Sequence, residues 1–372
     1  MQFRSEYNKA KHYSMLYRRK KIKMATLSEV AEKCGVSTAT VSYVMSGKGE
    51  EKRISPAMQE RIRAAAESLG YKRASSSAAP KKPRIAVFWP QRSIETTLLS
   101  VINGINTAIY FEPMPVNISI CPYESNHLAD QPMLWDTKDF DAALVASANT
   151  EDLSALRERP TKIPTVIVNR SVPGYPCVTV DHAEAGHIAA VHSVCKGGDN
   201  VGLVINPNSL LGMDLRANAF FKTCRDYGVD ISANVFYCEN TIDAGYELGV
   251  EMIRENRVPK VITCIYDIVS FGMLRALVEA GLNVGDEVQL LATGTSLSSF
   301  FSRCTPPMTM VEMHLEEVAQ RAMHVAVELA AHRIGMDTEI VLHPTMIYRA
   351  SSPVPTFDER AALEARRAAM NK

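Results

Sequence analysis

Small, hydroxylic and aromatic side chains occur together in the stretch "STATVSY", which runs from Ser37 to Tyr43. Thr38 and Ala39 can offer methyl groups to thymine, and Tyr43 can offer a hydroxyl group to a base edge. None of these three side chains can make the bidentate arginine–guanine contact that discriminates most sharply between bases. The set suits the floor of a DNA major groove, but it does not predict which base sequence is read.

Patterns that carry other chemistries do not single out a catalytic centre. The sequence has no G-x-G-x-x-G after a strand and no G-x-x-x-x-G-K-[ST]. The stretch "GTSLS" at Gly294 approaches the nucleophile elbow G-x-S-x-G, but Ser298 stands where the last glycine is needed. His182, His187 and His192 are each turned about 140° from the next on a helix, so we expect solvated or satisfied histidines. We therefore expect a protein that is not an enzyme, with no metal and no cofactor.

Charge is distributed unevenly along the chain. The 41 Lys and Arg residues balance the 41 Asp and Glu residues, but residues 1–84 carry 19 basic against 7 acidic side chains. The remainder carries 22 against 34, so the front has a charge of +12 and the rest −12. This asymmetry predicts a polyanionic partner for the front, with nucleic acid the first expectation and an anionic membrane the second.

Three short helices are expected to position the groove-facing side chains, over residues 26–35, 37–47 and 55–70. Each begins at a capping Ser or Thr and ends at a glycine, and each has apolar residues at helical spacing. The second helix is expected to bury Val41, Val44 and Met45 and to turn Thr38, Ala39, Ser42 and Tyr43 outward. The arrangement predicts a helix-turn-helix unit. A small helical bundle without a ligand is the alternative.

The segment from "TLSEVAEKCGVSTATVSYVMSG" to "ESLGY" resembles, almost end to end, the DNA-binding headpiece of the lactose-repressor and galactose-repressor (LacI/GalR) family of bacterial transcriptional regulators. The resemblance implies base contacts by Thr38, Ala39 and Tyr43. It also implies phosphate contacts by Ser37, Thr40 and Ser42.

After Pro83 the sequence alternates short, β-branched apolar runs with helical stretches. This alternation predicts parallel α/β structure, and nine or more strands suggest two sheets. The main runs are "IAVFWP", "NISICPY", "AALVASA", "TVIVNR", "CVTVDH", "VGLVINP", "NVFYCE", "VITCIYD" and "VQLLATG".

The same resemblance extends over nearly all of residues 85–350, through blocks such as "IPTVIVNR", "VTVDHAEAG" and "PPMTMVEMHLEEVAQRA". It implies a core like the periplasmic sugar-binding proteins, with two α/β subdomains joined by three crossings and a ligand cleft between them. Ligands in open α/β sheets lie beyond the carboxyl ends of the strands. The candidate effector-binding residues are Trp89, Asn169, Arg170, Arg216 and Asp267.

Several of these candidates have a structural alternative. Trp89 can be buried against the first core helix, Arg170 can brace its own loop, and Asp267 can cap the helix that follows it. Arg216 is expected in the first turn of a helix, where the dipole disfavours a cation, so a functional role becomes more plausible.

One departure from the family pattern concerns Gly294 and Thr295. In many sugar-responsive members the corresponding strand ends in an aspartate that binds ligand hydroxyls, and such a carboxylate is a strong sugar anchor. Because this aspartate is absent here, the sequence does not decide between a sugar, an anionic ligand, a purine-like ligand and no ligand.

The segment "RASSSAAP" joins the two parts. In the family a hinge helix forms here on DNA and inserts a leucine into the minor groove. This segment has no large apolar side chain, and Pro80 would interrupt a helix. We predict a flexible tether whose Lys81 and Lys82 contact phosphates, with Arg73 and Arg84 adding charge.

The sequence thus predicts a dimeric, ligand-responsive transcriptional regulator, in this family most often a repressor, that binds palindromic operator DNA. Scattered cysteines and the lack of a membrane span indicate the cytoplasm, associated with the nucleoid. Two rivals are an architectural DNA-binding protein and an α/β sugar or nucleotide enzyme fused to a DNA-binding module. The expected parts are a disordered basic extension (1–23), the DNA-binding domain (24–71), a linker (72–84), the effector-binding and dimerisation core (85–350) and a tail (351–372).

Overall fold

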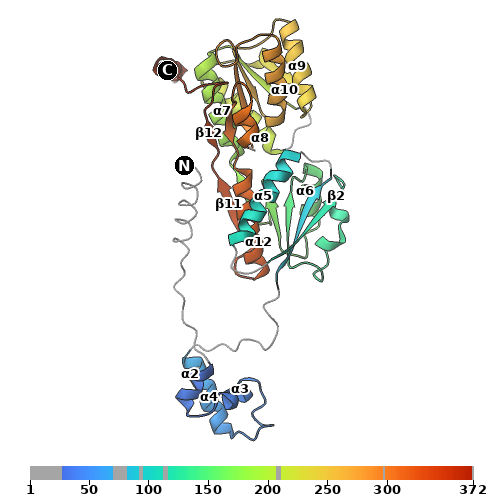
Figure 1. Ribbon diagram of the computed structural model, residues 1–372, viewed down its shortest axis with the longest axis vertical. Coiled ribbons are helices and arrows are strands. Elements are labelled where there is room, and N and C mark those ends of the chain that lie inside the picture. Colours follow the sequence, from blue (N-terminus) through green and yellow to red (C-terminus); the bar gives the residue numbers. More distant parts are fainter. Residues whose placement is uncertain are drawn as a thin grey trace. The chain divides into compact units, whose positions relative to one another are not determined.

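The computed structural model describes residues 27–69, 82–91, 95–111, 116–206, 211–295 and 298–370. The chain divides into two compact units, residues 1–81 and 82–372, and each is described by itself (Figure 1). The expected basic extension and the segment "RASSSAAP" lie outside the described residues.

The first unit contains the three expected helices. They are α2 (Leu27–Cys34), α3 (Thr38–Met45) and α4 (Pro56–Ser68). The Ser37 side chain accepts from the backbone N–H of Thr40 and so caps α3, while Ser55 caps α4 at Met58. Gly35 has a φ of 60°, a left-handed conformation that glycine adopts without strain and that ends α2.

A small apolar core holds these helices together. Val30 of α2, Val41 and Val44 of α3 and Ile62 of α4 are buried in it, and Met45 packs partly against it. Burying this stripe turns the opposite face of α3 outward, as the sequence predicts.

The second unit begins with a parallel six-stranded sheet in the order β11-β5-β4-β3-β1-β2. Helices α5 (Glu95–Phe111) and α12 (Leu315–Ala330) pack against each other beside this sheet (Figure 1). The strands are β1 (Arg84–Pro90), β2 (Asn117–Tyr123), β3 (Ala142–Ala146), β4 (Thr165–Val168), β5 (Cys177–Val180) and β11 (Glu339–Leu342).

The second sheet also has six strands, in the order β12-β10-β9-β8-β6-β7, and only β12 is antiparallel. The strands are β6 (Val201–Ile205), β7 (Val235–Tyr237), β8 (Val261–Cys264), β9 (Gln289–Gly294), β10 (Thr309–Glu312) and β12 (Thr345–Ile347). The helices around it are α7 (His182–Gly197), α8 (Leu211–Asp226), α9 (Ile242–Arg254), α10 (Asp267–Glu279) and α11 (Ser298–Arg303); α6 (Thr150–Glu158) belongs to the first sheet.

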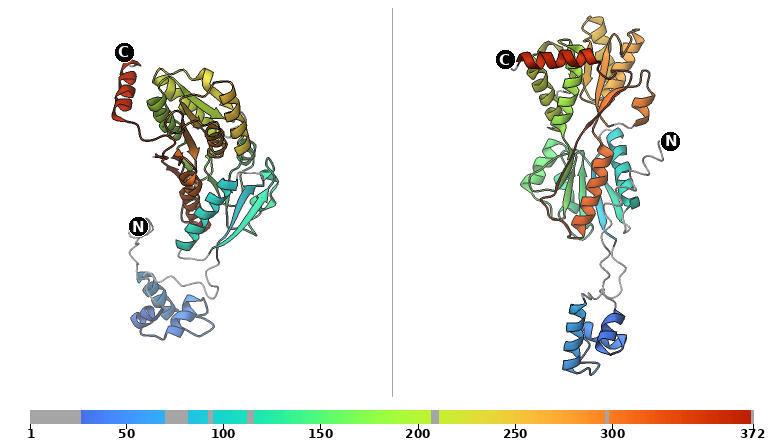
Figure 2. Two further views of the ribbon diagram at one scale, coloured as in Figure 1. Left: turned by 45° about the horizontal axis from the view of Figure 1, so that its top comes forward. Right: turned by 90° about the vertical axis from the view of Figure 1, so that its left-hand side faces the viewer.

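The chain passes between the two sheets three times: from β5 to α7, from β10 to α12, and from β11 to β12 (Figure 2). This agrees with the two-subdomain core expected from the resemblance. All nine expected strands are present. The sequence reading did not name β10, β11 or β12 among its strand runs, and β11 and β12 lack the continuous burial that marks a covered strand.

Two details differ from the expectations. Arg84 is the first residue of β1 rather than part of a tether, and its Nε lies 3.4 Å from Asp141 Oδ2. Arg216 is the sixth residue of α8, because that helix begins at Leu211, so it lies beyond the first turn. The argument from the helix dipole therefore does not apply to Arg216.

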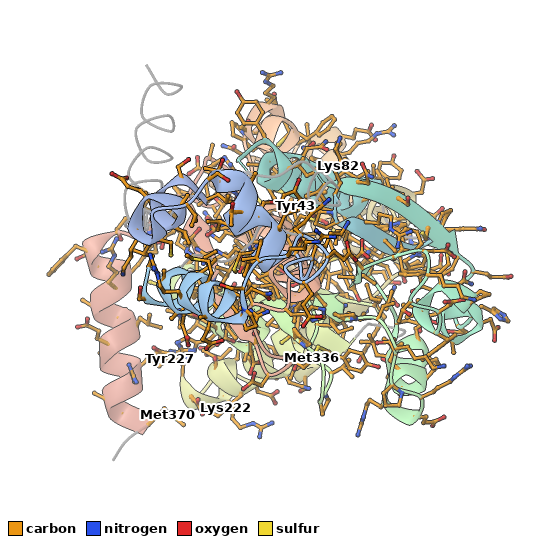
Figure 3. All side chains as sticks on the ribbon, turned by 90° about the horizontal axis from the view of Figure 1, so that it is seen from below. Tyr43, Lys82, Lys222, Tyr227, Met336 and Met370 are labelled. Atoms are coloured by element: carbon orange, nitrogen blue, oxygen red, sulfur yellow. The ribbon has the colours of Figure 1, made fainter. Side chains whose placement is uncertain are left out.

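The tail forms the helix α13 (Phe357–Met370), which contacts α7 (Figure 2). The ammonium group of Lys196, a buried residue of α7, lies 3.0 Å from Glu359 Oε1. Met370, labelled near Tyr227 in Figure 3, lies close to Gly228. The tail is thus attached to the second subdomain by a buried cation and by its last turn.

Candidate functional site

A cavity of about 340 Å³ lies in the second unit, at the carboxyl ends of strands from both sheets. We call it the inter-sheet cavity. Asn169 and Arg170 follow β4, while Asp267 follows β8 and Thr293 is the penultimate residue of β9. Its other polar lining residues are Thr97, Ser125, Ser147, Asn149, His182, Arg216, Asn240, Tyr266 and Thr295. Four of the five candidate effector-binding residues therefore line one cavity.

Arg216 is held rigidly at this cavity. Its Nη1 donates to the Ile265 carbonyl at 2.9 Å and to Thr293 Oγ1 at 3.1 Å, whereas its buried Nε has no acceptor. Burial, together with the charge of Arg170, lowers the pKa of Arg216 to about 10, so it remains a cation at neutral pH. A charged side chain thus lines the cavity and retains one buried N–H group without an acceptor.

The close approach of α7 to α8 positions Arg216. A Cβ at Gly186 would lie 2.0 Å from the Arg216 carbonyl oxygen, so only glycine fits there.

The Asp267 carboxylate already accepts hydrogen bonds from the protein backbone. Oδ1 accepts from the backbone N–H of Ile268 at 2.8 Å, and Oδ2 accepts from that of Thr295 at 3.0 Å. Burial raises the pKa of Asp267, and these hydrogen bonds oppose the shift. Asp267 does not cap α10 as the sequence alternative had it: it is the first residue of that helix, after the N-cap Tyr266, and Oδ1 accepts only from the next residue.

Gly294 makes this arrangement possible. A Cβ at position 294 would lie 2.5 Å from Asp267 Cγ and from Oδ2, so the space next to β9 is filled by the Asp267 carboxylate. A side chain at 294, such as the aspartate of many sugar-responsive members, does not fit beside Asp267 in this conformation.

His182 is a buried histidine, not a solvated one. It is 6% exposed and lines the cavity; neither ring nitrogen has a partner at full hydrogen-bond geometry, and the Asn169 backbone lies near the ring. Burial lowers the pKa of His182 to about 2, with the charges of Arg216 and Arg170 adding to the shift and the nearby Asn169 backbone offsetting it in part. His182 is therefore neutral. His187 and His192 instead bond to Thr223 and Ser352.

Asn169 and Arg170 form one corner of the cavity. Asn169 has a left-handed φ of 58°, and its buried Oδ1 has no partner. Arg170 donates from Nη1 to the Asn169 carbonyl at 2.8 Å, which is the local bracing that the sequence left as an alternative.

Trp89 does not line the cavity. It is 4% exposed within the apolar core that includes Val101 of α5 and Leu315 of α12, while the next residue, Pro90, reaches the cavity. This placement matches the alternative of burial against the first core helix.

Sequence reasoning missed His182, Asn240 and Thr293 as cavity residues. His182 and Asn240 lie a few residues after β5 and β7, and Thr293 is the penultimate residue of β9. A polar residue at or just after the end of a strand is the signal in the sequence that could have identified them. The sequence prediction used this signal for β1, β4 and β8 but not for β5, β7 and β9.

The outward face of α3 is the second candidate surface. Thr38, Ala39 and Tyr43 are exposed there, and Tyr43 is labelled in Figure 3. The Lys52 ammonium lies 5.3 Å from the centre of the Tyr43 ring. Ser37 and Thr40 hydrogen-bond to each other at 2.8 Å as part of the cap. Lys82 is exposed, and Lys81 lies outside the described residues.

The two parts of the chain that carry these surfaces match two family models. Residues 26–74 match the model of bacterial regulatory proteins of the lacI family, and residues 190–352 match that of a periplasmic binding protein-like domain. Together the matches cover more than half of the chain. The chain belongs to the lacI family. It is a DNA-binding transcriptional regulator with an effector-binding type of core.

Relatives and solved structures agree with the family. The chain is 26% identical to the HTH-type transcriptional regulator GalR of Streptococcus thermophilus, with 81% of this chain and 92% of that protein aligned. It is 23% identical to the repressor PurR of Mannheimia succiniciproducens, over 88% and 98% of the two chains. A LacI family regulator from Clostridium acetobutylicum matches with a TM-score of 0.68 and 24% identity, over 72% of this chain and all of the other. The lac repressor dimer bound to operator and the anti-inducer ONPF matches at 0.63 and 18% identity, over 89% and 100%.

These named relatives of this lacI-family chain are regulators rather than enzymes. Within the part of the chain that the structure describes, no group of three or more His, Cys, Asp or Glu side chains could hold a metal ion. In the same described ranges, no helix is both long and apolar enough to cross a membrane.

Proposed function

We propose that this protein is a dimeric repressor that binds a palindromic operator through α3 and changes its DNA affinity when a small molecule occupies the inter-sheet cavity. The observation that carries the proposal is the cavity itself, which has unpartnered polar atoms on residues that follow strands of both sheets. Such groups are costly when buried without a partner, so a ligand that supplies partners is favoured.

For DNA binding, we assign base contacts to Thr38, Ala39 and Tyr43 and phosphate contacts to Ser37, Thr40, Ser42, Lys81 and Lys82. The exposed face of α3 supports the first group, because a recognition helix reads the major groove with its outward side chains. Two copies would place two such helices on successive major grooves of a palindrome.

Apolar side chains exposed on the first β-α-β segment support a dimer. Tyr110 and Leu99 of α5 are 83% and 47% exposed, and Ile120 of the edge strand β2 is 53% exposed. A symmetric interface covers the same patch on both subunits, which would remove these side chains from water.

Communication between the sites would follow from the crossings. A ligand that contacts both subdomains favours one of their relative positions, and it can shift the equilibrium only by its difference in affinity for the two states. The segment "RASSSAAP" has no large apolar residue that could insert into the minor groove. The tether would therefore transmit the ligand signal by changing the spacing of the two DNA-binding units of the dimer. The protein would act in the cytoplasm, on nucleoid DNA.

The first test is to capture and sequence genomic fragments bound by the purified full-length protein at two salt concentrations. A recurrent palindrome with half-sites about one helical turn apart, or a multiple of it, is expected. Binding that is sensitive to salt but blind to sequence would contradict the proposal and favour an architectural protein. A DNA-bending assay on the recovered site should show no strong central kink.

A further inference from the structure

The residues that line the inter-sheet cavity carry unused groups of two kinds. The buried oxygens Asn169 Oδ1 and Asn240 Oδ1 have no donor, and the buried Arg216 Nε–H has no acceptor. Neutral His182 adds one acceptor, while its ring N–H lies near the Asn169 backbone, which raises its pKa. A complementary ligand must therefore donate at two or more points and accept at others. A molecule with several hydroxyl groups meets the first need.

The charge of the lining favours an anion. Among the lining residues that the structure describes, the charged side chains are Arg170, Arg216 and Asp267. Arg170 and Arg216 both lower the pKa of His182, and Arg170 lowers that of Arg216, so the local field is that of a cation. A negative group near Arg216 would relieve this repulsion.

The carboxylate that could anchor a neutral sugar is already in use. Asp267 accepts from Ile268 N, Thr295 N and, at 3.4 Å, Thr295 Oγ1. These contacts occupy most of the roughly four lone-pair positions of a carboxylate. A side chain at position 294 would collide with Asp267, so the end of β9 does not provide a second carboxylate.

Two helix N-termini next to the cavity have one backbone N–H group engaged from within. Asp267 Oδ1 accepts from Ile268 N of α10, and Asp181 Oδ1 accepts from Glu184 N of α7 at 2.8 Å. Phosphate groups are commonly held by free N–H groups at such termini. These two N–H groups are therefore not free for a phosphate, and Arg216 is the donor that a singly charged carboxylate would use.

We propose that the effector is a small polyhydroxylated carboxylate, of the sugar-acid class, whose carboxylate binds Arg216 and whose hydroxyls donate to Asn169 and Asn240. This inference rests on the proposed function, because it names the class of molecule that the sensor detects. The cavity volume of about 340 Å³ is at the lower end of the range for small-molecule sites, which favours one sugar ring or its open chain.

The test compares three probes that differ in one group: D-galactose, D-galacturonate and the methyl ester of galacturonate. Titration calorimetry and thermal unfolding of the full-length protein at pH 7.5 would be repeated with D-sorbitol and D-gluconate, a neutral and an acidic open-chain probe, and with hypoxanthine and inorganic phosphate. We expect at least one acid to bind about tenfold or more tightly than its neutral counterparts, because a charge-assisted hydrogen bond is stronger than a neutral one.

Arg216→Met is the informative variant. Thr293 Oγ1 donates to the Ile265 carbonyl at 2.7 Å on its own, so that carbonyl keeps a partner when the guanidinium is removed. The variant should fold and lose the preference for the acid over the ester. Asp267→Asn removes a negative charge at the site and should increase the ratio of the affinity for the acid to that for the ester.

Tighter binding of a neutral sugar, of hypoxanthine or of phosphate would overturn the inference, as would the absence of binding by both acids. The proposed function is tested separately by operator binding without a ligand. A protein that binds a palindrome and releases it with a neutral sugar would keep the function and disprove the ligand class.

Discussion

The outward face of α3 and the inter-sheet cavity both carry polar groups, but those on α3 are exposed to water and those at the cavity are buried. Thr38, Ala39 and Tyr43 are exposed on α3, where water satisfies the hydroxyl groups until DNA replaces it. Arg216 and His182 are 5% and 6% exposed and retain unpartnered nitrogens. An unused group in water has little energetic effect, whereas one in a protein interior costs about 1–3 kcal/mol.

The difference teaches that the two sites depend differently on the rest of the fold. Side chains on α3 can change without disturbing the core beneath them. Side chains in the cavity are fixed by close packing and by charge, so a change there alters stability and binding together.

Gly186→Ala should produce the largest effect. A Cβ at this position would lie 2.0 Å from the Arg216 carbonyl, so α7 and α8 must separate. We expect a loss of about 1–3 kcal/mol in the free energy of unfolding and a displaced Arg216, with ligand affinity reduced. Urea denaturation and calorimetry measure the two effects.

Gly249→Ala is the matched control, because its added Cβ would meet the Ala276 side chain at 2.6 Å in another helix contact. It should destabilise the protein and leave ligand affinity unchanged. Equal losses of affinity in both variants would show that packing at Gly186 has no special role.

Acid should destabilise the second unit through two buried histidines. The pKa of His182 is lowered to about 2, by burial and the charges of Arg216 and Arg170, and that of His192 to about 4, by burial and Lys196, with Glu359 opposing. Both lie below the value of about 6.5 in the unfolded chain. Their stabilisation is therefore complete above pH 6.5 and is lost as the pH falls below it.

Between pH 6.5 and 5.5 the two histidines together should reduce the free energy of unfolding by about 2 kcal/mol. His192→Asn should remove about half of that dependence in urea denaturation. A slope unchanged by this variant would mean that other groups take up the protons.

Tyr43→Ala tests the outward face of α3. It should change base preference by about 1–2 kcal/mol at one operator position, while the free energy of unfolding changes by less than about 0.5 kcal/mol. Selection of bound sequences before and after the substitution measures the first quantity. A large loss of stability would break the contrast between the two sites.

Replacing Lys81 and Lys82 by alanine should have the smallest effect on specificity. Affinity should fall uniformly across sequences, and the slope of log affinity against log salt should flatten by about 2. A change in base preference instead would refute the division between base and phosphate contacts.

Much of the fold followed from local signals. Capping serines, terminal glycines and apolar spacing located the three headpiece helices, and β-branched runs located nine strands. The half-exposed β11 and β12 carry no such signal, since their pairing is decided by distant parts of the chain.

The cavity was predicted in part. Asn169, Arg170, Arg216 and Asp267 could be placed because each follows a strand or matches the family pattern. Whether His182 is solvated or buried depends on α8 and on Arg216, which only the folded chain brings near it. The burial of Trp89 likewise depends on α12, more than 200 residues later in the sequence.

The first and second crossings have a consequence for anyone who redesigns this regulator. His182 is the first residue of the helix entered at the first crossing, and Met313 and Leu315 line the cavity where the chain crosses a second time. Residues that line the cavity thus also lie where the chain passes from one subdomain to the other. A variant selected for a new inducer should therefore also change the basal expression of its target genes, even when no inducer is present.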